Sequence, residues 1–135
     1  MERDEAAGRF SAARVAVLGT VGPNGPHLVP VVFAVAGDRI YTAIDHKPKR
    51  TRRLQRLRNI ERDPRVSLVA DEYDEDWECL WWVRADGMAA VVDAAQVEAG
   101  LDLLEQKYRQ YEGRRPDGPV IVVTVSNWTG WSAAG

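Results

Sequence analysis

The connection between two apolar runs near the N-terminus is the feature that most constrains the fold of this chain. Residues 15–21 (VAVLGTV) and 27–35 (HLVPVVFAV) are rich in β-branched side chains, and only GPNGP separates them. Within this connection, Asn24-Gly25 supplies the positive φ angles that a tight hairpin turn requires. We therefore predict an antiparallel hairpin, which assigns this part of the chain to a sheet.

Further β-rich runs follow at the short spacing of a meander. They cover residues 39–44, 65–73, 79–92 and 120–127. The run at 79–92 is much longer than the usual ~5–6 residues of a strand, and Gly87 near its middle suits a bent strand in a barrel wall. The run at 27–35 lacks polar and apolar alternation. We therefore expect both of its faces to be covered, and a second subunit is one candidate for the cover.

Helical patterns accompany the strands. Leu54, Leu57 and Ile60 recur at helical spacing, which predicts a helix over residues 51–62 that ends at Asp63-Pro64. Asp93 and Gln96 resemble a capping box that opens a second, amphipathic helix. Its predicted buried stripe consists of Val97, Leu101, Leu104, Tyr108 and Tyr111. The N-terminal residues 1–14 are charged and helix-like, without the apolar region of a signal peptide.

About six antiparallel strands, two or three helices and mostly hairpin connections predict a mainly β fold, a small barrel or sandwich with helices at its ends. A chain of 135 residues suits one domain, so we expect residues 1–135 to form a single one. No apolar run approaches the ~20 residues that span a bilayer. The single cysteine, Cys79, excludes an internal disulfide and suits a reducing compartment. We expect a cytoplasmic protein with no membrane partner.

The stretch from Lys47 to Arg65 is unusually basic. It holds nine Lys or Arg against two acids, in a chain whose formal net charge is -2. Charged runs are usually solvated helix faces, but clustered positive charges repel, and exposed ion pairs contribute only ~0–1 kcal/mol each. A polyanionic ligand explains the stretch better. Nucleic acid is disfavoured, because the pI is about 5.7 and the stretch contains no aromatic residue to stack on bases.

Little in the sequence supports catalysis by side chains or a metal site. His27, His46 and Cys79 lie far apart, so neither a zinc site nor a catalytic pair is expected from them. The motifs of serine hydrolases and P-loop proteins are absent. The glycines of GTVGPNGP lack the GxGxxG spacing of a dinucleotide-binding turn. We therefore expect no catalytic side chain and no metal.

The order of these segments resembles the pyridoxamine 5′-phosphate oxidase-like split-barrel superfamily, in particular its F420-dependent (deazaflavin) oxidoreductases of actinobacteria. The resemblance covers about Val15 to Trp131, and GTVGPNGPHLVPVVFAV and DHKPKRTRRLQRLRNIERDPRVSLVADEY carry it. It implies a split β-barrel of six or so antiparallel strands that forms a homodimer. It also implies that a cofactor phosphate is held by Lys49, Arg50 and Thr51, with Lys47 and Arg53 nearby.

The resemblance implies F420 as the cofactor, with FMN as the alternative. The pyridoxamine phosphate oxidases proper carry an Arg and a Lys on the second strand that help to hold the FMN phosphate, whereas VPVVFAV has neither. They also end with an Arg and a His that hold the substrate, where this chain ends TGWSAAG. The expected function is hydride transfer between reduced F420 and a small organic acceptor, in a groove between two subunits. The alternatives are an FMN-binding protein of this fold and a non-catalytic F420 carrier.

Two tryptophans are candidate walls for the cofactor. Neighbouring residues on a strand point to opposite faces, so Trp82 should lie opposite Trp81, which is expected to pack in the core. Trp82 is thus an interface or cofactor-wall candidate. Trp77 could cover a ring system or fold onto the core. In addition, the arginines at 53, 56 and 58 form a candidate track for the carboxylates of the F420 tail.

Overall fold

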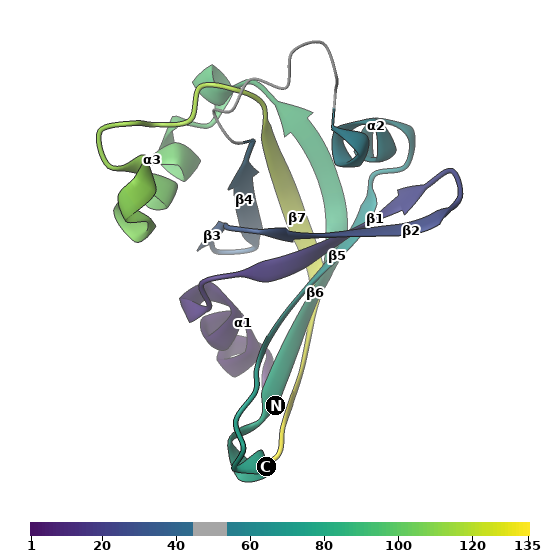
Figure 1. The fold of residues 1–135 in the computed structure, drawn as a ribbon, viewed down its shortest axis with the longest axis vertical. Coiled ribbons are helices and arrows are strands. Elements are labelled where there is room, and N and C mark those ends of the chain that lie inside the picture. The colour runs from purple at the N-terminus through teal and green to yellow at the C-terminus, as the bar shows by residue number, and fades with distance from the viewer. Residues whose placement is uncertain (45–53) are drawn as a thin grey trace.

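The protein consists of one strongly curved antiparallel sheet with helices packed around it (Figure 1). The structure, a computed structural model, describes residues 1–44 and 54–135. Within these ranges seven strands form a sheet in the order β2-β1-β5-β6-β7-β4-β3. The strands are β1 (Ala16–Gly22), β2 (Gly25–Val31), β3 (Ala34–Ala36), β4 (Arg39–Ala43), β5 (Arg65–Glu72), β6 (Trp81–Val92) and β7 (Val120–Ser132). The predicted mainly β, antiparallel fold class is confirmed.

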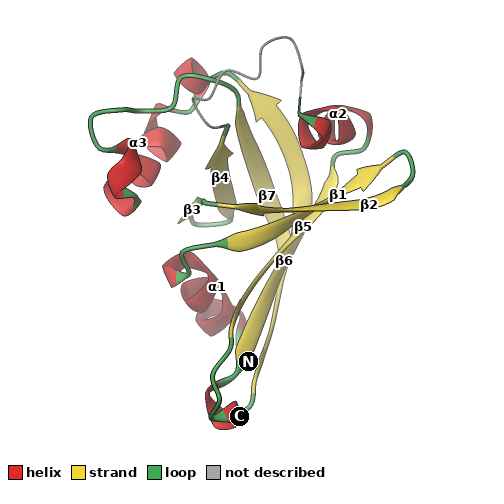
Figure 2. Ribbon diagram, in the orientation of Figure 1, coloured by secondary structure: helices red, strands yellow, loops and turns green. Residues whose placement is uncertain are grey.

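The helices lie around the strongly curved sheet (Figure 2). The α-helices of the described ranges are α1 (Arg3–Ala12), α2 (Gln55–Arg62) and α3 (Glu98–Lys107), and the short 3-10 helices are η1 (Trp77–Cys79), η2 (Ala94–Gln96) and η3 (Arg109–Tyr111). The predicted capping box is present at η2, where the backbone N–H of Asp93 donates to Oε1 of Gln96 at 3.0 Å. Among these helices, none has both the length and the apolar character needed to cross a bilayer.

The predicted second amphipathic helix is divided. Non-helical backbone angles at Val97 and Tyr108 separate η2, α3 and η3, so one continuous helix over 93–111 was wrong. The predicted stripe is nevertheless largely correct, because Leu101, Leu104 and both tyrosines are buried. Helical periodicity therefore survives across short breaks, because each segment resumes with its apolar side toward the sheet.

The predicted hairpin forms, with its turn displaced by one residue. β1 pairs with β2 from Ala16 opposite Val31 to Gly22 opposite Gly25, which leaves Pro23-Asn24 as the two-residue turn. Gly25 has a φ of 122°, a value that side chains with a Cβ rarely adopt. The sequence signal for the hairpin was thus correct, although the glycine lies just after the turn and not inside it.

The strand predicted at 27–35 is split into β2 and β3, and this split explains the barrel. β2 and β3 lie at opposite ends of the strand order, although only Val32 and Phe33 separate them. So short a connection requires the sheet to roll until its two edges meet. At the break, the Phe33 N–H donates to the Tyr108 hydroxyl at 3.1 Å, and that hydroxyl lies 3.0 Å from the Phe33 carbonyl oxygen. At this break, hydrogen bonds to a side chain replace strand pairing. The continuous apolar run gave no sign of the break.

Apolar clusters cover both faces of the rolled sheet. Inside the barrel, Phe10 of α1 and Leu57 and Ile60 of α2 are among the buried residues that pack with the strands. Outside it, α3 packs Leu104 against a second cluster that includes Tyr41 of β4. β4 is consequently buried on both faces, and α2 and α3 lie on either side of the end of this strand.

β6 is long and irregular at Gly87, as predicted. It pairs with β7 along its length, and the register shifts between Asp86 and Gly87, which leaves Ser126 of β7 as the extra residue. A Cβ on Gly87 would overlap with the backbone of Thr124. β6 starts at Trp81 instead of Cys79, because residues 77–79 form η1, and β7 continues past the predicted end at 127 by pairing with the first residues of β6.

Candidate functional site

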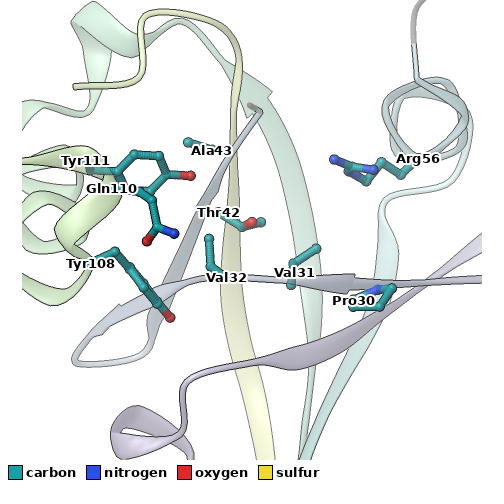
Figure 3. Close-up of a pocket in the computed structure, with 9 residues that line it drawn as sticks. All are labelled: Pro30, Val31, Val32, Thr42, Ala43, Arg56, Tyr108, Gln110 and Tyr111. Atoms are coloured by element: carbon teal, nitrogen blue, oxygen red, sulfur yellow. The ribbon is translucent and has the colours of Figure 1, made fainter. Parts of the chain in front are cut away.

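A cavity of about 340 Å³ opens where β2, β4, α2 and η3 approach one another (Figure 3). Six of the nine lining residues are apolar or aromatic, two are polar and uncharged, and one is charged. These residues are Pro30, Val31, Val32, Thr42, Ala43, Arg56, Tyr108, Gln110 and Tyr111. A concave apolar site with a few polar groups is typical of small-molecule binding, and its volume lies in the usual range of ~300–1,000 Å³.

The cavity follows from the split in the barrel. Where β2 ends, the chain turns away from the strand ladder, and the Tyr108 hydroxyl holds Phe33 in place. The same contact brings the Tyr108 ring to one side of the opening (Figure 3). Beyond β4, the backbone N–H of Ile44 donates to the carbonyl oxygen of Pro119 at 3.1 Å. The cavity therefore lies between the end of β4 and the side of α2.

Arg56 supplies the charge of this cavity. Its side chain extends from α2 toward the β2 and β4 side of the opening (Figure 3). Its Nε is buried and forms no hydrogen bond within the described ranges. Burial lowers the pKa of the guanidinium from its ordinary value. A buried donor without an acceptor costs ~1–3 kcal/mol, so an anion bound beside Arg56 would remove a penalty that the protein alone carries.

α2 is held in a fixed orientation by a short chain of side-chain hydrogen bonds. Nε2 of Gln55 donates to Oδ1 of Asn59 at 2.7 Å, and Nδ2 of Asn59 donates to the hydroxyl of Thr20 at 3.0 Å. Asn59 and Thr20 are both buried, so these bonds anchor the helix on β1. The packing of α2 therefore sets the side of the helix from which Arg56 extends.

The arginines of α2 do not form one continuous track. Arg58 is exposed and donates to Oε1 of Gln55 at 2.6 Å, whereas Arg56 faces the cavity. Residues two positions apart on a helix are rotated by about 200°, so these two side chains leave opposite sides of α2. The predicted track through positions 53, 56 and 58 is thus not formed by its last two members, and Arg53 lies outside the described residues.

The predicted phosphate contacts belong to the segment between β4 and α2. Lys47, Lys49, Arg50, Thr51 and Arg53 all lie outside the described residues, and their role stays a prediction. The chain positions on either side of that segment do approach the site, because Ala43 and Arg56 both line the cavity.

Trp77 and Trp82 do not line the cavity of their own chain. Trp82 pairs with Trp131 of β7, on the sheet face opposite to Trp81. Trp81 packs against the barrel core, and its Nε1 donates to a carboxylate oxygen of Glu72 at 3.1 Å. The predicted alternation of these neighbours is confirmed. Trp77 is 67% exposed in η1, at the lower end of the molecule in Figure 1, far from α2 and α3.

Sequence reasoning did not identify the wall that η3 gives to the cavity. Tyr108 and Tyr111 were assigned to the buried stripe of a helix, and Gln110 carried no signal at all. The contact that brings this wall to the site joins Phe33 and Tyr108, which are 75 positions apart. A pattern within one segment does not report on so distant a neighbour.

Other reactive groups of the described chain offer little chemistry. Within residues 1–44 and 54–135, no three His, Cys, Asp or Glu side chains are grouped so that they could hold a metal ion. Desolvation, together with the carboxylates of Asp76 and Asp74, raises the pKa of the Cys79 thiol. A raised pKa suppresses the thiolate that would act as a nucleophile.

Comparisons with known proteins place the fold. Residues 3–132 match the model of the family described as pyridoxamine 5′-phosphate oxidase. The search of curated proteins found no significant match. Among solved structures, the conserved hypothetical protein Rv2991 from Mycobacterium tuberculosis is 22% identical with a TM-score of 0.78, and the match covers 98% of this chain and 86% of that one.

Two further solved structures have the same fold. A FAD-binding protein from Mesorhizobium loti is 18% identical with a TM-score of 0.70, and the match covers 96% of this chain and 92% of that one. A heme binding protein from Mycobacterium smegmatis is 16% identical with a TM-score of 0.72, and the match covers 97% of this chain and 57% of that one. At such identities the likeness establishes the fold alone.

Proposed function

The chain belongs to the pyridoxamine 5′-phosphate oxidase family, and from this premise we propose that it is an oxidoreductase that uses the deazaflavin F420. In this proposal, the enzyme transfers a hydride between reduced F420 and a small organic acceptor. The cofactor supplies the hydride, and the protein supplies binding, orientation and a shielded cavity. No side chain is assigned to covalent or acid–base catalysis.

The observation that carries this proposal is the composition of the β2 side of the cavity. Pro30, Val31 and Val32 line it, so the wall is apolar throughout. The resemblance to pyridoxamine phosphate oxidases associates FMN with an Arg and a Lys on this strand, and neither residue type occurs in β2. The positive charge at the cavity comes from α2, through Arg56.

The described residues suit a cofactor that carries a flat ring. Val31 and Val32 offer an apolar surface, and Tyr108 and Tyr111 contribute aromatic side chains on the other side of the cavity (Figure 3). We propose that Lys49, Arg50 and Thr51 hold the cofactor phosphate, with Lys47 and Arg53 nearby, as the resemblance implies.

We also propose that the protein is a single-domain, cytoplasmic homodimer. Leu28 of β2 is 69% exposed and Trp131 of β7 is 46% exposed, although both are large apolar residues. Trp77 and Trp82 do not line the cavity of their own chain, so they could contact the cofactor only across the boundary between two copies. The cofactor role predicted for these two tryptophans therefore depends on the dimer.

An FMN-binding protein is the second candidate. It is favoured by the FAD-binding protein of Mesorhizobium loti, which has this fold. FMN and F420 share a tricyclic ring and a ribityl phosphate, so a phosphate site alone does not separate them. The apolar β2 wall is the reason for preferring F420.

The test is to titrate the purified protein with F420 and with FMN and to measure binding by fluorescence. We expect F420 to bind more tightly, and Arg50→Ala to weaken its binding by about 10- to 100-fold, because a charged hydrogen bond contributes ~1.5–3 kcal/mol. Arg3→Ala in α1 is the control and should leave the affinity unchanged. Tighter binding of FMN would reject F420 as the cofactor, and F420 binding without oxidation of reduced F420 by any tested acceptor would indicate a carrier.

A further inference from the structure

We propose that Arg56 is the receptor for a carboxylate on the acceptor, so that the substrates are small organic acid anions with a flat, apolar body. This inference rests on the proposed function, because it names the acceptor class for the same cavity. It concerns a residue that the resemblance to the family does not assign to the cofactor phosphate. Three features of the described residues carry it: the unpaired Nε of Arg56, the neutrality of the other lining residues and the anchoring of the helix that bears Arg56.

The charge of Arg56 is isolated. Within the described ranges its buried Nε has no hydrogen-bond acceptor, and burial lowers the pKa of the group without a compensating carboxylate among the causes. Other arginines differ in this respect, since Arg65 is paired with Asp63 and Arg84 with Asp86. A planar guanidinium forms paired hydrogen bonds with a carboxylate, so such a ligand would satisfy Nε and neutralise the charge together.

The other lining residues determine the size and polarity of the uncharged part of the ligand. Pro30, Val31 and Val32 are apolar, and Tyr108 and Gln110 are neutral. Among the described lining residues Arg56 is the one charged group, and the others are neutral, so these residues favour an anion whose charge lies beside Arg56. The volume of about 340 Å³ restricts the ligand to a small molecule. The described walls therefore favour a small organic anion with a compact unsaturated or aromatic body.

The helix that carries Arg56 is anchored before a ligand arrives. α2 is anchored on β1 through the buried pair of Asn59 and Thr20, at 3.0 Å. A charge held at one place in a cavity is suited to orienting an acceptor for hydride transfer, which depends on the relative position of the two reactants.

Benzoate and benzamide are the probes for this proposal, because they share size and shape but differ in charge. Binding to the cofactor-free protein is measured by NMR chemical-shift titration for the wild type, for Arg56→Gln and for Arg58→Gln. Arg58 leaves the opposite side of the same helix and is the matched control. We expect the wild type and Arg58→Gln to bind benzoate at least 10-fold more tightly than benzamide. Arg56→Gln should bind both probes equally.

The F420 affinity of the same three proteins separates the acceptor from the cofactor. We expect Arg56→Gln to change it by less than about 3-fold, because the cofactor phosphate is assigned elsewhere. A loss of 10-fold or more, or a benzoate preference that survives Arg56→Gln, would overturn the proposal. Equal binding of both probes by the wild type would overturn it as well. If no variant binds F420, the proposed function fails, while the probe titrations still decide the role of Arg56.

We expect Arg56→Gln to fold. Arg56→Gln removes a partly buried charge that has no partner in the described part of the chain, and such a change does not sacrifice a native contact. We expect its thermal midpoint to be equal to or above that of the wild type. Arg56→Lys provides a second check, because it keeps the charge but lacks the planar fork. It should retain part of the preference for benzoate.

Discussion

The hydroxyl of Tyr108 is the residue-scale feature on which the split barrel depends. It accepts a hydrogen bond from the Phe33 N–H at 3.1 Å, and it lies 3.0 Å from the Phe33 carbonyl oxygen and 2.9 Å from that of Arg14. These contacts join the break between β2 and β3, the segment after α1 and the end of α3. The Tyr108 hydroxyl thus gives the buried Phe33 N–H its acceptor and donates its proton to one of the two carbonyl oxygens.

We expect Tyr108→Phe to lower the free energy of unfolding by about 1–3 kcal/mol, because the buried N–H of Phe33 would lose its acceptor. Urea denaturation measures the change. Tyr41→Phe is the control, since Tyr41 is also buried but no hydrogen bond joins its hydroxyl to the described residues. Equal stabilities for the two variants would contradict the role assigned to the Tyr108 hydroxyl.

Lys107, which lies next to this contact, makes a pH-dependent contribution to the stability of the fold. Its Nζ donates to the carbonyl oxygen of Ser11 at 3.0 Å and lies 3.9 Å from the centre of the Phe33 ring. Desolvation by burial, followed by repulsion from Arg14, lowers the pKa of Lys107 from 10.5 to about 8. Between these two values the unfolded chain binds more protons than the folded one, so stability rises with pH. The penalty for burying the charge is complete below pH 8.

Lys107→Met should remove this dependence. We expect the difference between the thermal midpoints, wild type minus variant, to become more positive as the pH rises from about 7 to about 9.5. The reason is that the wild-type lysine loses its proton at a lower pH in the folded state than in the unfolded state. The effect should be small, since the side chain is only partly buried and solvent screens it. A difference between the two proteins that is constant with pH would contradict the lowered pKa.

At the scale of elements, the pairing of β6 with β7 depends on the absence of a side chain at one point. The register shifts between Asp86 and Gly87, and the backbone of Thr124 occupies the position that a Cβ on Gly87 would take. The bulge allows a twelve-residue strand to follow the curvature of the barrel. Both strands contribute to the core that supports the cavity, so this glycine acts on the whole sheet.

Gly87→Ala should reduce the free energy of unfolding by roughly 1–3 kcal/mol or more, because backbone must move to accept the methyl group. Gly8→Ala in α1 is the matched control. Apart from the helix's own backbone, no described atom lies within 4 Å of the added methyl there, and the better helix propensity should stabilise the protein by up to ~1 kcal/mol. Denaturation of both variants by urea is the measurement. A neutral Gly87→Ala would show that the strands separate easily at the bulge.

At the scale of the whole molecule, the part of the outer sheet face formed by β2 and β5 exposes apolar side chains. Leu28 is 69% exposed on β2 and Val69 is 37% exposed on β5, and both lie on the face opposite to the buried Leu18 and Leu68. Exposed apolar residues grouped on one sheet face are typical of an interface. The sequence already predicted a second cover for the run containing Leu28, which agrees with the proposed homodimer.

We expect the wild type to sediment as a dimer at micromolar concentration and Leu28→Glu to sediment as a monomer. A charge at this exposed position should change the stability of one subunit by no more than ~0.5 kcal/mol, but it would be buried without a partner in the dimer. Circular dichroism serves as the control for folding. A monomeric wild type, or a dimeric Leu28→Glu, would exclude this face as the interface.

The sequence by itself determined the parts of the molecule that depend on local chemistry. Four features follow from turn geometry or periodicity within one segment. They are the hairpin turn before Gly25, the capping box at Asp93, the bend at Gly87 and the buried stripe of Leu101 and Leu104. These signals are reliable because each reflects the steric and burial requirements of a few neighbouring residues. They predicted the mainly β class and most of the strands.

Only the tertiary structure decided where the barrel splits and which arginine serves the cavity. The break at Phe33 is stabilised by Tyr108, 75 positions away, so nothing in the apolar run itself marks it. Arg56 and Arg58 are equivalent by composition. They differ because packing of Leu57, Asn59 and Ile60 against the barrel turns one arginine inward and the other to solvent. Long-range packing, which local periodicity does not encode, therefore selected the charged group of the site.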